Sequence, residues 1–168
     1  MNFLNILLIF LAVTGGIYDL TCRKIPNWLT FGAFFSALGF NVIFSRNVDL
    51  IFNCLLGFAL GLALLIIPYI FGGMGAGDVK FLAAIGSIVG FKNVVSVFLY
   101  SAICGMFLGI VWLIFNPNRL KFLVVTGQIL PVVDNKQKIP YGIAILMGTL
   151  LYITPGVNNF IYNILIWK

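Results

Sequence analysis

The stretch LLGFALGLALLIIPYIF, residues 55–71, is the part of the sequence that decides the fold. It contains no charged residue and does not alternate apolar with polar side chains, so it predicts a helix and argues against a strand of a transmembrane barrel. It lies within the uncharged run 50–77, which exceeds the roughly 20 residues that a helix needs to cross a hydrocarbon core. The stretch therefore predicts a membrane-spanning helix.

The rest of the chain extends this pattern. Of 168 residues, 62% are apolar and 8% are charged, whereas soluble domains carry about 25% charged residues. Further uncharged runs cover residues 1–18, 25–45, 81–91, 93–118 and 139–167. We expect an all-α integral membrane protein, with a single domain over residues 1–168 that forms a bundle of about six transmembrane helices.

Two of these uncharged runs differ in length from a single membrane span. The run 81–91 is short, and we expect Lys80 and Lys92 to extend their side chains to the interfaces so that the segment can cross. The last run is too long for one span, and Pro155 with Gly156 predicts a break between a span at 141–154 and an interfacial tail. The long connection 116–138 is expected to lie at the membrane interface or to pack on the helix ends.

The distribution of basic residues predicts the orientation in the membrane. One side receives Arg23, Lys24, Lys80, Arg119, Lys121, Lys136 and Lys138, and the other receives Arg46, Lys92 and Lys168. Because cytoplasmic loops carry the excess of Lys and Arg, we expect a protein of the cytoplasmic membrane with its N-terminus outside. The net charge of +6 then reflects topology and contact with membrane lipid, and predicts no nucleic-acid partner.

The sequence predicts neither a metal site nor a cofactor. It contains no histidine, and its three cysteines, Cys22, Cys54 and Cys104, do not form a CxxC pair. The glycine-rich segment 72–77 is followed neither by the GK[ST] of a nucleotide-binding loop nor by a GxGxxG pattern. The absence of histidine also argues against a Ser–His or Cys–His catalytic site.

All four acidic residues are aspartates. Asp49 and Asp134 fall in short polar loops, where a solvated carboxylate needs no special explanation. Asp19 closes the first apolar run, where the negative end of the helix dipole disfavours an anion, and pairing with Arg23 or Lys24 is the simple alternative to a functional role. Asp78 follows the glycine-rich turn GGMGAG and is expected to be the N-cap of the next helix.

Topology places Asp19 and Asp78 on one side of the membrane, because two long apolar runs, 25–45 and 50–77, separate them. The positive-inside rule makes that side cytoplasmic. Two neighbouring carboxylates cannot both ionise readily and tend to share one proton. One can then activate a water molecule while the other donates a proton to a peptide carbonyl, so the pair predicts hydrolysis without a covalent intermediate.

Three motifs give the chain a resemblance to the type IV prepilin peptidases. They are Asp19 followed by IPNWLT (25–30), the block GGMGAGDVKFLAAIG (72–86) that contains GxGD, and KIPYGIA (138–144). Presenilin-type proteases also pair Tyr-Asp with GxGD, and Tyr18 precedes Asp19 here. Their aspartates lie on consecutive helices, however, whereas two spans separate Asp19 from Asp78 in this chain.

The resemblance implies a membrane-embedded aspartic endopeptidase that cleaves the leader peptide of prepilin-like precursors at the cytoplasmic face. It makes Asp19 and Asp78 the catalytic pair. It also places a group of further residues at or near the site, namely Gly75, Gly77, Lys80, Pro140, Tyr141 and Gly142. The cysteine-rich insertion of the methylating long forms is missing, since only residues 21–27 fill that loop. The chain therefore resembles the short peptidases of tight-adherence pili or the archaeal preflagellin peptidases, without N-methyltransferase activity.

Three alternative functions stay open at this point. A transporter or channel component would use intramembrane carboxylates to carry ions, although acids near mid-span and duplicated halves are not seen. An assembly subunit of a secretion system would retain the motifs without catalysis. A presenilin-like intramembrane protease is the third.

Overall fold

The computed structural model describes residues 3–71, 74–115 and 141–154, and every regular element within these residues is a helix. In chain order these are α1 (Phe3–Cys22), α2 (Asn27–Phe40), the π-helical turn η1 (Asn41–Ser45), α3 (Val48–Ile70), α4 (Ala76–Val89), α5 (Phe91–Phe115) and α7 (Tyr141–Ile153). The all-α fold is therefore as predicted. The connection 116–138 and the tail after Pro155 lie outside the described residues.

The helices fall into two length classes. Four segments are long and apolar enough to cross a membrane: Phe3–Cys22, Asn27–Ser45, Val48–Ile70 and Phe91–Phe115. The other two helices are shorter, with 14 residues in α4 and 13 in α7, which correspond to lengths of about 21 and 20 Å. The chain is a multi-pass membrane protein in which long helices accompany two short ones.

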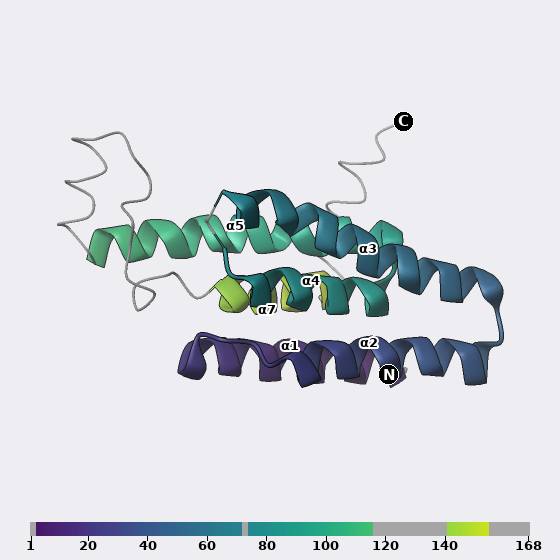
Figure 1. Cartoon of the computed structure of the whole chain (residues 1–168). Coiled ribbons are helices and arrows are strands. Elements are labelled where there is room, and N and C mark those ends of the chain that lie inside the picture. The colour runs from purple at the N-terminus through teal and green to yellow at the C-terminus, as the bar shows by residue number, and fades with distance from the viewer. Residues whose placement is uncertain (1–2, 72–73, 116–140, 155–168) are drawn as a thin grey trace, which may run out of the picture.

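The short helices occupy the middle of the bundle. In Figure 1, α1 and α2 lie along one side, α3 and α5 lie along the other, and α4 and α7 lie between them. Helix α4 contacts every other α-helix in the described part of the chain, and residues 81–87 form one continuous buried stretch. The large exposed apolar side chains are concentrated on the long helices. The core is thus built around α4, and the long helices present apolar side chains to lipid.

Glycine allows α3 and α4 to pack with their backbones in contact. A Cβ atom added to Gly57 of α3 would overlap the carbonyl oxygen of Gly86 on α4, and one added to Gly86 would overlap the carbonyl oxygen of Gly57. One turn further along α3, a Cβ on Gly61 would lie 2.8 Å from the Ala83 Cα. These contacts fix α4 against α3 along its length, and therefore fix the position of its first turn.

Candidate active site

Helices α1 and α4 run antiparallel, and two contacts fix their register. In the middle of α1, Gly15 lies directly against the ring of Phe81 on α4. Beyond the end of α1, Ile25 contacts Gly77 in the first turn of α4, where a Cβ on Gly77 would lie 3.4 Å from the Ile25 backbone nitrogen. The last turns of α1 therefore lie beside the start of α4.

This register brings Asp19 and Asp78 to the same level on helices that touch. Asp19 lies four residues beyond Gly15, which is a rise of about 6 Å, and Asp78 lies three residues before Phe81, which is a rise of about 4.5 Å in the same direction. Both side chains are buried, with exposed fractions of 6% for Asp19 and 8% for Asp78. The structure agrees with the expectation that the two aspartates share one end of the bundle.

Asp19 is held by a helix distant in sequence. Its Oδ2 accepts a hydrogen bond from the Gly142 N–H at 2.6 Å, in the first turn of α7. The backbone carbonyl of Asp19 also accepts from the Arg23 N–H at 3.0 Å, which closes the last turn of α1. Although the C-terminal end of α1 disfavours an anion, the N-terminal end of α7 favours one, so α7 offsets the unfavourable position of Asp19.

Asp78 is not the N-cap of α4, as the sequence predicted. The N-cap is Gly75, and α4 begins at Ala76, so Asp78 is the third helical residue. Its Oδ2 accepts a hydrogen bond from the Gly75 N–H at 3.1 Å, while its own N–H donates to the Gly75 carbonyl at 3.1 Å. The carboxylate thus reaches back to the cap residue, as the acidic residue of a capping box does. The prediction was wrong because glycine serves as an N-cap nearly as well as aspartate.

The first turn of α7 lies beside Asp19. The Gly142 N–H binds Asp19 Oδ2, and α7 also contacts α4, the helix that carries Asp78. A Cβ added to Gly142 would lie 2.7 Å from both Cβ and Oδ2 of Asp19, so only glycine fits without a shift. The ring of Tyr141 packs in turn against Gly105 of α5. Tyr141 and Gly142, two of the residues that the resemblance places near the site, thus lie in the first turn of α7, whereas Pro140 lies outside the described residues.

Lys80 lies on the side of α4 that faces α2. Its Nζ donates a hydrogen bond to Asn27 Oδ1 at 3.1 Å and lies 5.9 Å from the centre of the Phe31 ring. The sequence predicted a lysine that extends along the helix to the membrane interface, but the structure shows one that joins the starts of α4 and α2. Sequence reasoning did not anticipate the bond between Asn27 and Lys80, because the two residues are 53 positions apart.

The other two aspartates do not join this cluster. Asp49 was expected in a loop, but it lies in the first turn of α3 and is exposed. Its N–H donates to the side chain of the N-cap residue Asn47 at 2.9 Å. Asp134 lies outside the described residues. Within the described part of the chain, no group of three or more His, Cys, Asp or Glu side chains could hold a metal ion.

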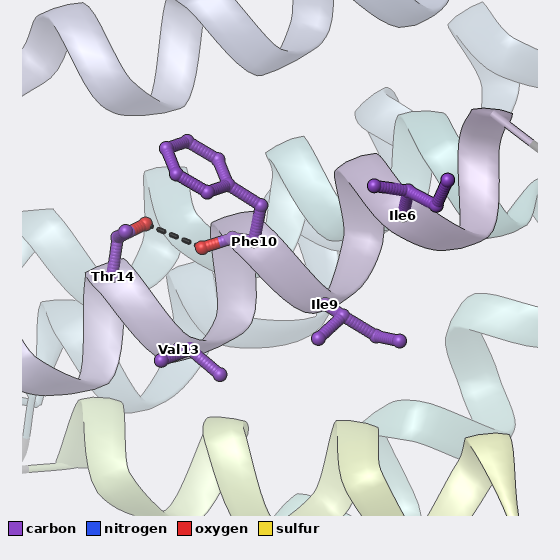
Figure 2. Close-up of a pocket in the computed structure, with 5 residues that line it drawn as sticks. All are labelled: Ile6, Ile9, Phe10, Val13 and Thr14. Atoms are coloured by element: carbon purple, nitrogen blue, oxygen red, sulfur yellow. Dashed lines mark hydrogen bonds between the residues drawn. The ribbon is translucent and has the colours of Figure 1, made fainter.

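The surface depression shown in Figure 2 is separate from the aspartates. It measures about 320 Å³ and is lined by residues of α1 alone, namely Ile6, Ile9, Phe10, Val13 and Thr14. The only hydroxyl group among them, on Thr14, donates to the Phe10 carbonyl at 2.6 Å and so is already engaged with its own helix. An apolar depression on a lipid-facing helix carries no reactive group, and the candidate site is therefore the aspartate cluster.

Comparison with known protein families identifies the family of the chain that carries this aspartate cluster. The model of the type IV leader peptidase family matches residues 6–110, which is more than half of the 168-residue chain. The chain belongs to the type IV leader peptidase family. The match extends from α1 into α5 and so contains both Asp19 and Asp78, while α7 follows it. No curated protein and no solved structure matches the chain.

Membership of the leader peptidase family confirms the resemblance that the motifs indicated. It makes the chain a peptidase whose substrates are precursor proteins in general. Sequence reasoning missed the residues that set the register of the site, Gly15 and Phe81. A glycine pair at 15–16 within an apolar run was the available signal, since a missing side chain permits a neighbouring helix to approach.

Proposed function

We propose that this leader peptidase is an aspartic endopeptidase in which Asp19 and Asp78 are the catalytic pair. The observation that carries the proposal is that two buried carboxylates from helices distant in sequence lie at one level, on helices in direct contact. Burial of two acids at one place costs free energy of folding. Ionisable groups in membrane segments are therefore functional candidates by default.

The chemistry follows from the sharing of one proton. The ionised carboxylate removes a proton from a water molecule, whose oxygen attacks the carbonyl carbon of the scissile peptide bond. The protonated carboxyl donates its proton to the carbonyl oxygen, and a tetrahedral diol forms. Collapse of this intermediate breaks the C–N bond: the nitrogen takes a proton from the carboxyl group that received one from water, and one diol hydroxyl gives its proton to the other carboxylate as the new carboxyl carbonyl forms. The pair returns to its starting state with one proton.

The proposed substrates are prepilin-like precursors, cleaved between their leader peptide and the segment that follows. We place the site at the cytoplasmic face and the N-terminus outside, because the basic residues near Asp19 and Asp78, such as Arg23, Lys24 and Lys80, are on the side that the positive-inside rule makes cytoplasmic. The short loop between α1 and α2 supports a single-activity peptidase of the tight-adherence or preflagellin type, without N-methylation.

Substitution of each aspartate by asparagine tests the proposal. Asp19→Asn and Asp78→Asn should each abolish cleavage, because an amide can neither accept the proton of water nor donate a titrating one, and the double variant should be no worse than either single one. The assay is co-expression with a prepilin from the same source, with precursor and mature forms separated by gel and the enzyme level followed in the membrane fraction.

Asp49→Asn and Asp134→Asn are the matched controls and should cleave as the parent does. Cleavage at the parental rate by either Asp19→Asn or Asp78→Asn would refute the proposal and favour a transporter or assembly role. Loss of cleavage must also occur without loss of protein, since removing one charge from a buried pair relieves repulsion and does not hinder folding.

A further inference from the structure

A polar contact outside the aspartate pair joins the starts of α2 and α4. Lys80, in the second turn of α4, donates a hydrogen bond from Nζ to Oδ1 of Asn27 at 3.1 Å, and Asn27 is the first residue of α2. The same Nζ lies 5.9 Å from the centre of the Phe31 ring, one turn further along α2, which is within the range of a cation–π interaction. Two side chains of α2 therefore hold one ammonium group of α4.

An apolar contact lies beside this bond. Ile25 is buried just before α2, and a Cβ atom on Gly77 in the first turn of α4 would lie 3.5 Å from its Cβ. The N-cap residue of α2, Pro26, makes no side-chain capping bond. A hydrogen bond from a charged donor contributes more than one between neutral groups. The start of α2 is thus attached to the first turns of α4 by one apolar and one charged contact.

The same attachment restrains the end of α1. Asp78 lies two residues before Lys80 on α4, and Asp19 lies in the last turn of α1. Only residues 23–26 connect α1 to α2. The connection begins at the turn that carries Asp19, since the Arg23 N–H donates to the Asp19 carbonyl at 3.0 Å. Because so short a connection has little freedom, fixing the start of α2 on α4 also fixes the end of α1 beside the start of α4.

We infer that Lys80 and Asn27 form a clamp that positions the aspartate pair, in which their hydrogen bond holds the start of α2 on α4 and so keeps Asp19 level with Asp78. This inference rests on the proposed function. Both members of the clamp are positioning residues, because they act through the two aspartates. Asp19 is then held from two directions, by the Gly142 N–H of α7 and by the clamp between α2 and α4.

Asn27→Ala tests the clamp, because it removes the acceptor and leaves the charge of Lys80 in place. We expect kcat to fall by about tenfold or more, since a displacement of about 1 Å at a catalytic centre costs roughly a hundredfold in rate. KM should change by less than about twofold, because the clamp acts on the catalytic pair. The measurement uses purified full-length enzyme in detergent and a synthetic precursor peptide, at a temperature where thermal unfolding shows every variant to be folded.

Asn27→Asp is the conservative variant. Its carboxylate accepts the same bond from Lys80, so kcat should stay within about twofold of the parent. A role in stability alone would not make kcat of the folded enzyme depend on an acceptor at this position.

Lys80→Met removes the other partner of the bond and keeps an unbranched apolar side chain. It should lower kcat as Asn27→Ala does, and the double variant should be no worse than either single one, because each change removes the same bond. Lys92→Met is the matched control. It removes an exposed lysine at the start of α5, next to the opposite end of α4, and should keep the parental kcat.

Parental kcat in Asn27→Ala would overturn the inference, and a slow Lys80→Met beside it would show that the lysine acts through its charge alone. Asn27→Asp as slow as Asn27→Ala would overturn it too, since the acceptor would then not matter. Asp19→Asn and Asp78→Asn in the same assay separate the two proposals. If they are inactive while Asn27→Ala is fully active, the proposed function stands without the clamp. If they are active, the proposed function itself fails.

Discussion

Helices α3 and α4 both carry an aspartate in their first turn, yet the two helix starts differ in almost everything else. Asp49 is exposed, and the side chain of Asn47 caps its helix. Asp78 is buried, its helix begins at a glycine, and its own carboxylate binds the cap residue. The local sequence makes a helix start in both cases. What turns one of them into a candidate active site is the presence of α1 and α7 beside it.

The largest effect is expected when the position of the carboxylate is changed without changing its chemistry. Asp78→Glu keeps the acid but moves it by one methylene group, and a displacement of about 1 Å at a catalytic centre costs roughly a hundredfold in rate. Asp49→Glu should have no effect, because an exposed carboxylate has room to adjust. The measurement compares the cleavage rates of the two variants on one precursor peptide. Equal rates would show that the two helix starts are functionally alike.

A smaller effect is expected when the neighbour of the site is displaced. Gly142→Ala places a Cβ atom where Asp19 now lies, so α7 or Asp19 must shift, and we expect activity to fall by about tenfold or more. Gly32→Ala on α2 is the control, since nothing lies within 4 Å of its added Cβ. That change should leave activity intact and stabilise the helix by up to about 1 kcal/mol. Thermal unfolding in detergent separates the two effects, and a fully active Gly142→Ala would contradict the account of α7.

The smallest effect is expected at the start of α3. Asn47→Ala removes the side-chain acceptor for the Asp49 N–H and should cost about 1 kcal/mol of stability. This corresponds to a fall of a few degrees in Tm. Cleavage activity should not change, because the helix start at Asn47 is remote from the aspartate pair. An activity loss larger than the stability loss would show that the two helix starts are coupled.

The sequence predicted most of the fold, and it proposed the two aspartates of the candidate site, because both inferences depend on patterns along the chain. Uncharged runs located the helices, and two intervening spans were enough to bring Asp19 and Asp78 to one end. The contacts that organise the site could not be predicted in this way. The bond between Gly142 and Asp19 joins residues 123 positions apart and depends on how α7 docks. The cap of α4 was misplaced because several residues before Asp78 can start a helix.

The different lengths of α4 and α5 set the depth at which the proposed reaction takes place. The two helices join at Gly90, and α5 rises about 37 Å from there against about 21 Å for α4. Helix α5 therefore continues roughly 16 Å past the start of α4 at Ala76, and the contact between Tyr141 and Gly105, ten residues before the end of α5, lies near that level. Hydrolysis consumes one water molecule for each bond cleaved, so this depth makes the supply of water part of the kinetics.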